Sequence, residues 1–203
     1  MRFLLLACDY DGTLAREGRV DVEEERALER LRASGRKIVL MTGRLLENLL
    51  AAFPKAVLCD RIVAENGAVL HAPETRETRL LAKPPPEEFA RALERRIGAP
   101  PAAGLVIVAT GRPHEAHVLE VIRELGLEFH VTFNRGAGMA LPPGVTKATG
   151  LARGDYSRWI RESIKDEDLA AEVEEIERAR KLSPREARSH LPERIEARYA
   201  GPA

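Results

Sequence analysis

Two aspartates, Asp9 and Asp11, flank a single residue at the end of an apolar run, and Gly12 follows them directly. The run covers residues 3–8, and apolar runs of this length that end in turn residues are typical of a strand buried on both faces. Because burial of an unpaired carboxylate is costly, acids at the carboxyl end of such a strand indicate a bound cation or a reaction there. That end is also where open α/β sheets bind ligands. The alternative is a pair of acids that simply begins a solvated loop.

Polar residues follow apolar runs at other points of the chain as well. Thr42, Gly43 and Arg44 come after the run at 38–41, and Glu65-Asn66-Gly67 comes after the run at 62–64. Lys147 lies just beyond a Pro-Pro-Gly sequence. Simpler explanations stay open at this point. The first group could be a strand-to-helix turn, Asn66-Gly67 could be a hairpin turn, and Lys147 could be a surface lysine at the start of a helix.

The segment Asp-Tyr-Asp-Gly-Thr-Leu at residues 9–14 resembles the nucleophile motif of the haloacid dehalogenase superfamily, Asp-x-Asp-x-Thr. The segments around Thr42 and Lys147 look like the second motif and the lysine motif of the same superfamily. The segment around Asn66 is similar to the Asn-Gly strand end of its Cof-type, sugar-phosphatase-like branch. Order and spacing agree from residue 1 to about residue 151, which is roughly three quarters of the chain.

The resemblance implies phosphoryl transfer through an aspartyl-phosphate intermediate. It makes Asp9 the nucleophile and Asp11 the general acid and base. It further implies that Thr42 donates a hydrogen bond to the phosphoryl group and that Lys147 stabilises the charge of the transition state. Mg²⁺ would be held by the Asp9 carboxylate and the Asp11 carbonyl oxygen, and it would keep several waters. The residues expected to bind the substrate, a small phosphorylated metabolite such as a sugar phosphate, are Gly12, Gly43, Arg44 and Asn66.

One motif of the superfamily is missing from this chain. The fourth motif follows a further strand after the lysine and supplies acids that complete the Mg²⁺ shell. Gly154-Asp155 has the right residue types, but it lacks the preceding apolar strand and the acid four residues later, and it follows Lys147 too closely. We therefore assign no metal ligand there.

This absence leaves three explanations for the chain. The first is a Mg²⁺-dependent phosphatase of the haloacid dehalogenase superfamily. The second is a catalytically weak or inactive relative that binds a phospho-ligand, or a partner through its helical tail. The third is an internal deletion or gene-model error that joins a truncated phosphatase to an unrelated C-terminal piece.

The elements that must position these residues alternate between strands and helices, which predicts a parallel sheet with both faces covered. We expect an α/β protein with a doubly wound, Rossmann-like core, a small inserted α/β cap and a helical C-terminal tail. The core is expected at residues 1–82 and 142–152, the cap at 83–141 and the tail at 153–203. Core elements are predicted at 22–33, between Asp21 as N-cap and Gly35 as stop signal, and at 38–41, 45–53 and 61–64. Cap elements are predicted at 87–96, 105–110, 115–125, 128–133 and 138–141.

The missing fourth-motif strand also has a consequence for the sheet. In the superfamily that strand pairs with the strand carrying the nucleophile, so here residues 3–8 would form an apolar sheet edge. We expect the C-terminal helices to pack against this edge, or the chain to form a homodimer across it.

Composition excludes other classes of function. The chain has 32 Lys and Arg against 32 Asp and Glu, so its formal net charge is zero and it has no basic footprint for nucleic acid or membrane. Its longest apolar run is too short to span a bilayer and lacks the features of a signal peptide, so we expect a cytoplasmic protein. Cys8 and Cys59 fit neither a disulfide framework nor a metal motif, and we expect Cys8 to be a small core residue.

Overall fold

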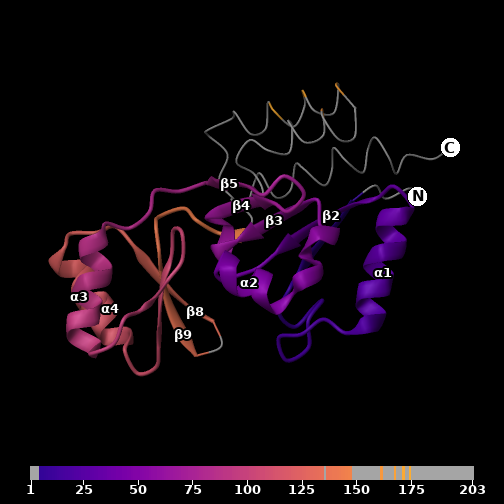
Figure 1. Cartoon of the computed structure of the whole chain (residues 1–203). Helices are drawn as coiled ribbons and strands as arrows, with labels where there is room; N and C mark the ends of the chain where they lie inside the picture. Colours follow the sequence, from indigo (N-terminus) through magenta and orange to yellow (C-terminus); the bar gives the residue numbers. More distant parts are fainter. Residues whose placement is uncertain are drawn as a thin grey trace, which may run out of the picture.

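The computed structural model describes residues 5–134 and 136–147, together with the isolated positions 161, 167, 171 and 174. Within this part the strands form two sheets, which belong to two neighbouring lobes in Figure 1. We call them the core sheet, with strand order β1-β2-β3-β4-β5, and the insert sheet, with strand order β6-β7-β9-β8. The predicted α/β fold class is confirmed.

The core sheet combines a parallel part with an antiparallel hairpin. Its strands are β1 (Leu5–Asp9), β2 (Lys37–Met41), β3 (Arg61–Ala64), β4 (Val69–Ala72) and β5 (Glu77–Leu80). The pairs β1–β2 and β2–β3 are parallel, as predicted, whereas β3–β4 and β4–β5 are antiparallel. The connection after β3 is too short for a crossover, so the chain turns back at Asn66-Gly67, where a hairpin turn was one of the explanations left open. The β4–β5 hairpin that follows was not predicted.

The helices of the core begin and end where local signals place them. α1 (Val22–Ala33) starts at Asp21, whose side chain accepts hydrogen bonds from the first-turn amides, and it stops before Gly35 with a φ of 79°. α2 (Leu46–Ala52) continues into the 3₁₀ helix η1 (Pro54–Leu58). No helix in the described part of the chain is long and apolar enough to cross a bilayer.

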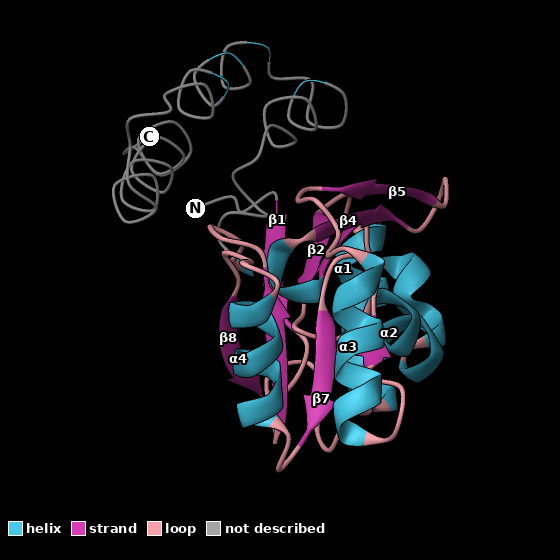
Figure 2. Ribbon diagram, turned by 90° about the vertical axis from the view of Figure 1, so that its left-hand side faces the viewer, coloured by secondary structure: helices cyan, strands magenta, loops and turns pink. Residues whose placement is uncertain are grey.

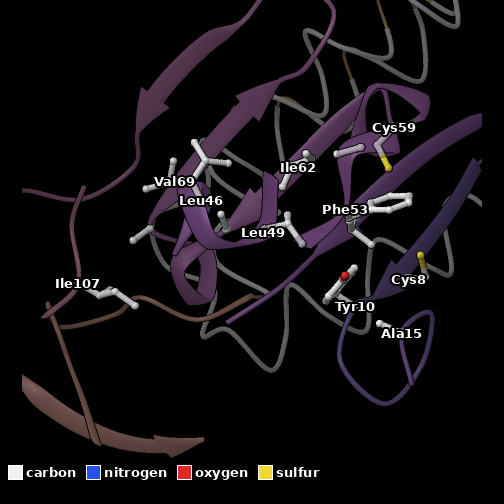
Figure 3. Close-up of a cluster of buried hydrophobic side chains, with 14 of the residues drawn as sticks. Cys8, Tyr10, Ala15, Leu46, Leu49, Phe53, Cys59, Ile62, Val69 and Ile107 are labelled. Atoms are coloured by element: carbon white, nitrogen blue, oxygen red, sulfur yellow. The ribbon is translucent and has the colours of Figure 1, made fainter. Parts of the chain in front are cut away.

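The apolar core lies between these helices and one face of the core sheet (Figure 3). The sheet contributes Ile38, Leu40 and Ile62, which are all fully buried, and α2 contributes Leu49. Cys8 belongs to the same cluster, as expected for a small core residue. Helical cover of the opposite face stays a prediction.

β1 is an edge strand of the sheet in the described residues, because it pairs only with β2. Ala7 is exposed, and 38% of the Leu6 surface is accessible. The predicted burial of this strand on both faces is therefore wrong, because the adjacent residues Leu6 and Ala7, which point to opposite faces, are both exposed. The predicted edge is confirmed for the described part of the chain. The helices expected to cover the edge fall outside the described residues.

The insert sheet is joined to the core between β5 and the segment that carries Lys147. Its helices α3 (Glu87–Ile97) and α4 (Glu115–Glu124) lie side by side along the sheet in Figure 2 and bury a cluster of their own against it. Its strands are β6 (Ala102–Ala103), β7 (Val108–Gly111), β8 (His130–Asn134) and β9 (Ala137–Leu141). The strand predicted at 105–110 starts only at Val108, because residues 104–107 form a turn closed by a 2.8 Å hydrogen bond between the Gly104 amide and the Ile107 carbonyl.

Candidate active site

The predicted site residues meet at the carboxyl edge of the parallel strands. Asp9 ends β1, Thr42 follows β2, and Asn66 lies in the turn Glu65–Gly67 directly after β3. Lys147 is 138 positions away from Asp9 in the sequence, yet its Nζ donates a hydrogen bond to Asp9 Oδ1. The tertiary structure thus brings residues of four separate segments to one edge.

The Asp9–Lys147 pair is accessible to solvent. The two side chains are 33% and 35% exposed, so a ligand can reach the carboxylate and the ammonium group. Gly67 sets the position of the lysine segment, because a Cβ at this residue would lie 2.0 Å from the carbonyl oxygen of Thr146. A side chain there would push the backbone next to Lys147 away from the sheet.

The loop after β1 folds back on the end of its own strand. Gly12, with a φ of 83°, allows this reversal. The amide of Leu14 then donates to the Asp9 carbonyl at 3.2 Å, and the amide of Ala15 donates to the Tyr10 carbonyl at 2.7 Å. Tyr10 is fully buried, and its hydroxyl donates to the Gly18 carbonyl at 3.1 Å. Tyr10 was given no role from the sequence alone, although its place between two aspartates indicated that its side chain points the opposite way, into the core.

Asp11 is held by Arg44 through two parallel hydrogen bonds. The distances are 2.9 Å from Arg44 Nε to Asp11 Oδ2 and 2.7 Å from the second guanidinium nitrogen to Oδ1. The guanidinium also lies over the Tyr10 ring, 4.8 Å from its centroid. The hydrogen bonds to Asp11 raise the pKa of Arg44 further above its usual range. The direct contact of Arg44 is thus with the proposed acid, while its predicted contact with substrate stays a prediction.

Thr42 is buried and has a hydrogen available for an anion. Its Oγ1 accepts a hydrogen bond of 3.0 Å from the amide of Arg44, which leaves the hydroxyl hydrogen to donate. Gly43, the next residue, is also buried. The position agrees with a phosphoryl-binding role at this edge, which stays a prediction for both residues.

The Glu65-Asn66-Gly67 turn links the core to the insert. Its hairpin role, one of the two explanations left open above, is what connects β3 to β4. The Asn66 amide donates to the Thr42 carbonyl at 3.1 Å, and its side-chain nitrogen lies 3.8 Å from the sulfur of Met139 in β9. Contact of Asn66 with substrate is untested.

Glu65 was not assigned a role by the sequence analysis, yet it is fully buried. An acid at the end of a buried strand was the signal that singled out Asp9, and the same signal was present here. Its carboxylate accepts hydrogen bonds from backbone amides of the turn at 104–107 in the insert.

The donors at this edge suit a hydrated Mg²⁺. The Asp9 carboxylate and the Asp11 carbonyl oxygen are the hard oxygen ligands this ion prefers, and Mg²⁺ commonly keeps several waters beside one or two carboxylates. The Asp11 carboxylate is turned toward Arg44. Among the described residues no group of three or more His, Cys, Asp or Glu side chains could enclose a metal ion. The set therefore fits a metal held by few protein ligands.

Comparison with known proteins points to one superfamily. The family model described as haloacid dehalogenase-like hydrolase matches residues 6–96. Phosphatase YwpJ of Bacillus subtilis (strain 168) is 36% identical over 73 residues, which cover 36% of this chain and 26% of that protein. The chain thus spans about a quarter of the length of this curated relative.

Solved structures show the same fold at lower identity. The sugar phosphatase BT4131, described as a subclass IIB member of the superfamily, has a TM-score of 0.51 and 20% identity, with 72% of this chain and 73% of that chain covered. A protein of Thermoplasma acidophilum has a TM-score of 0.56 and 15% identity, with 82% and 75% covered. At these identities the likeness shows a shared fold alone.

Proposed function

We propose that the chain is a Mg²⁺-dependent phosphatase of the haloacid dehalogenase superfamily, in its Cof-type branch. The match of residues 6–96 to the model of haloacid dehalogenase-like hydrolases supports this proposal. Its substrate would be a small phosphorylated metabolite, with a sugar phosphate as the first choice. The observation that carries the proposal is the contact between Lys147 and Asp9. A nucleophilic carboxylate beside a cation, both open to solvent, is the arrangement that attack on an anionic phosphate ester needs.

In the first half of the reaction, an Asp9 oxygen attacks phosphorus and the bond from phosphorus to the leaving oxygen breaks. Asp11 gives its proton to that oxygen, so the product leaves as an alcohol. Lys147 and the hydroxyl of Thr42 stabilise the charge that builds up on the phosphoryl oxygens. The two parallel hydrogen bonds from the Arg44 guanidinium fix the orientation of the Asp11 carboxyl group.

In the second half, water attacks the phosphorus of the aspartyl-phosphate. Asp11, now ionised, takes a proton from that water, and the bond between phosphorus and the Asp9 oxygen breaks. Phosphate is released and Asp9 returns as a carboxylate. Asp11 is protonated again, ready for the next leaving group.

Mg²⁺ would be held by the Asp9 carboxylate and the Asp11 carbonyl oxygen. When bound, it would neutralise negative charge on the phosphoryl group and bring the two anions together. Lys147 also reduces the electrostatic repulsion between the Asp9 carboxylate and the anionic ester, since its ammonium group already contacts that carboxylate.

The insert would act as a cap that selects the leaving group. The contact between Asn66 and Met139 of β9 supports this role for the insert. The sugar-phosphate class follows from the resemblance to the Cof-type branch and agrees with the sugar phosphatase among the structural neighbours.

A binding protein without turnover is the second candidate. The observation that favours it is the sparse metal site, since the described residues contain no cluster of three or more potential ligand side chains. Such a protein would bind inorganic phosphate at Lys147 and Thr42 and would release none from an ester.

The test is Mg²⁺-dependent release of phosphate from p-nitrophenyl phosphate by the purified full chain, with Asp9→Asn as the control. We expect turnover that is lost in EDTA and in the variant. Folded wild-type protein with no more turnover than Asp9→Asn would exclude the phosphatase. Calorimetric titration with inorganic phosphate would then decide whether the binding role is correct.

A further inference from the structure

The buried carboxylate of Glu65 joins the core to the insert. Oε1 accepts a hydrogen bond of 2.9 Å from the amide of Leu105, and Oε2 accepts bonds of 2.8 Å and 3.0 Å from the amides of Val106 and Ile107. These amides belong to the turn between β6 and β7. Successive amides that point at one carboxylate form a concave anion site, and here a residue of the core occupies it.

The side chains around this contact are packed to fit it. Val106 and Ile107 are fully buried and belong to the core cluster, although they come from the insert. Figure 3 shows Ile107 reaching toward the cluster from the insert side. A Cβ on Gly104 would lie 2.6 Å from the Glu65 carboxylate, so the turn approaches this closely only because it has no side chain there.

The backbone at Glu65 contacts the parts of the proposed active site. Glu65 and Asn66 both have positive φ, 52° and 55°, a conformation that non-glycine residues adopt only when the surroundings enforce it. The Glu65 amide donates to the Arg44 carbonyl at 3.0 Å, and the neighbouring Gly67 packs on the carbonyl of Thr146, next to Lys147. The backbone contacts of residues 65–67 therefore connect Glu65 directly to the segments that carry Arg44 and Lys147.

One part of this boundary is less densely filled. A cavity of about 540 Å³ lies between α2 and the turn at 104–107. Its lining includes Leu46 and Leu50 from α2 and Leu105 from the turn.

We propose that Glu65 is a positioning residue: its carboxylate clamps the turn at 104–107 onto the end of β3 and so keeps the insert and the Lys147 segment aligned with Asp9. We call this contact the Glu65 clamp. Its effect on turnover rests on the proposed phosphatase function, whereas the clamp itself can be measured without any activity.

The first measurement is amide hydrogen exchange in the full chain, wild type against Glu65→Gln. The glutamine is nearly isosteric but presents an NH₂ group to donors, so it cannot accept all of these bonds. We expect the amides of Leu105, Val106 and Ile107 to exchange at least about tenfold faster in the variant. Unchanged exchange at these amides would overturn the clamp.

The matched control is Glu47→Gln. Glu47 lines the same cavity, but it is exposed and has no hydrogen bond to the turn at 104–107. We expect wild-type exchange in this variant. Equal acceleration in both variants would show that any charge change at the cavity loosens the turn, and would overturn the specific role of Glu65.

A second variant reaches the clamp from the other side. Gly104→Ala keeps glutamate at position 65 but adds a methyl group that would clash with its carboxylate. The carboxylate should therefore move away and leave the same amides without their acceptor. This variant keeps the test decisive if Glu65→Gln fails to fold. Wild-type exchange in Gly104→Ala would show that the carboxylate does not need this position, and would contradict the proposal.

The activity measurement separates positioning from mere stability. At a temperature where circular dichroism shows Glu65→Gln fully folded, we expect kcat/KM for p-nitrophenyl phosphate to fall about tenfold, with Glu47→Gln within about twofold of wild type. Wild-type kcat/KM in folded Glu65→Gln would overturn the positioning role. If the wild type itself has no turnover, the phosphatase proposal fails, and the exchange experiment alone decides on the clamp.

Discussion

Two acidic sites at the same edge of the core sheet differ in their partners. Asp9 and Asp11, at the end of β1, contact the charged side chains of Lys147 and Arg44. Glu65, after β3, is fully buried and bound by backbone amides. A side-chain cation can move to meet an incoming phosphate, whereas a backbone amide inside a packed turn cannot. The partner of a carboxylate at a strand end therefore decides whether that carboxylate is available for chemistry.

Asp9→Asn tests the accessible acid of this comparison and has the largest expected effect. The amide is a poor nucleophile, so we expect turnover of p-nitrophenyl phosphate to drop by at least about 1,000-fold. Because Asp9 is a third exposed, thermal unfolding should change little. Retained turnover in this variant would mean that another group attacks the phosphorus.

Lys147→Met tests the cation on the accessible side of the comparison. Loss of a charge at the transferring phosphoryl group should reduce kcat about 100-fold. Lys37→Met is the matched control, since the Lys37 side chain is about as exposed as that of Lys147 and pairs with Asp60 at 2.8 Å, but lies at the amino end of β2. Equal loss in both variants would indicate a general effect of removing a lysine–aspartate pair.

Glu65→Ala tests the buried side of the comparison through stability. Removing the carboxylate leaves buried amides without their acceptor, so the free energy of unfolding should fall by about 2 kcal/mol or more. Urea unfolding followed by circular dichroism measures this change. Glu47→Ala, which truncates an exposed acid, should keep the wild-type midpoint, and an equal shift in both would refute the distinction.

Arg44→Lys tests whether Asp11 needs the two parallel hydrogen bonds from Arg44 or only a positive charge beside it. Lysine keeps the charge but cannot form two parallel hydrogen bonds with a carboxylate, so we expect kcat to fall about tenfold. Arg91→Lys, at an exposed Arg–Glu pair on α3, should keep wild-type kcat. Wild-type turnover in Arg44→Lys would show that charge alone is sufficient.

The last prediction concerns the reactivity of Cys8, the neighbour of Asp9, and involves no change in turnover. Burial, and to a lesser degree the charge of Asp9, raise the pKa of the Cys8 thiol to about 11, and burial raises that of Cys59 to about 12. At pH 8 the reactive thiolate is therefore at least about 100-fold rarer than in an ordinary cysteine. Iodoacetamide labelling should be slow in the native protein and fast in urea. Rapid labelling of native Cys8 would show that the end of β1 opens to solvent.

Much of the fold could be predicted because its signals are local. Asp21 and Gly35 mark the ends of α1 through a side-chain cap and a positive φ, and both act within one turn of the helix. The apolar runs that became β2 and β3 were recognised in the same way. The β4–β5 hairpin was missed, since His71, Thr78 and Arg79 interrupt its apolar pattern and its outer strand is exposed along its whole length.

The sequence by itself determined which residues could do chemistry and the order of the elements that carry them. Motif spacing and strand-end position depend on neighbours along the chain, so Asp9, Asp11 and Thr42 could be placed at one sheet edge without coordinates. The tertiary structure decided the partners: Lys147 on Asp9, Arg44 on Asp11, and the amides of 105–107 on Glu65. These contacts join residues that are 33 to 138 positions apart, and no local pattern records where the chain returns. The role of each carboxylate depends on that return, because it sets both the burial and the charge beside it.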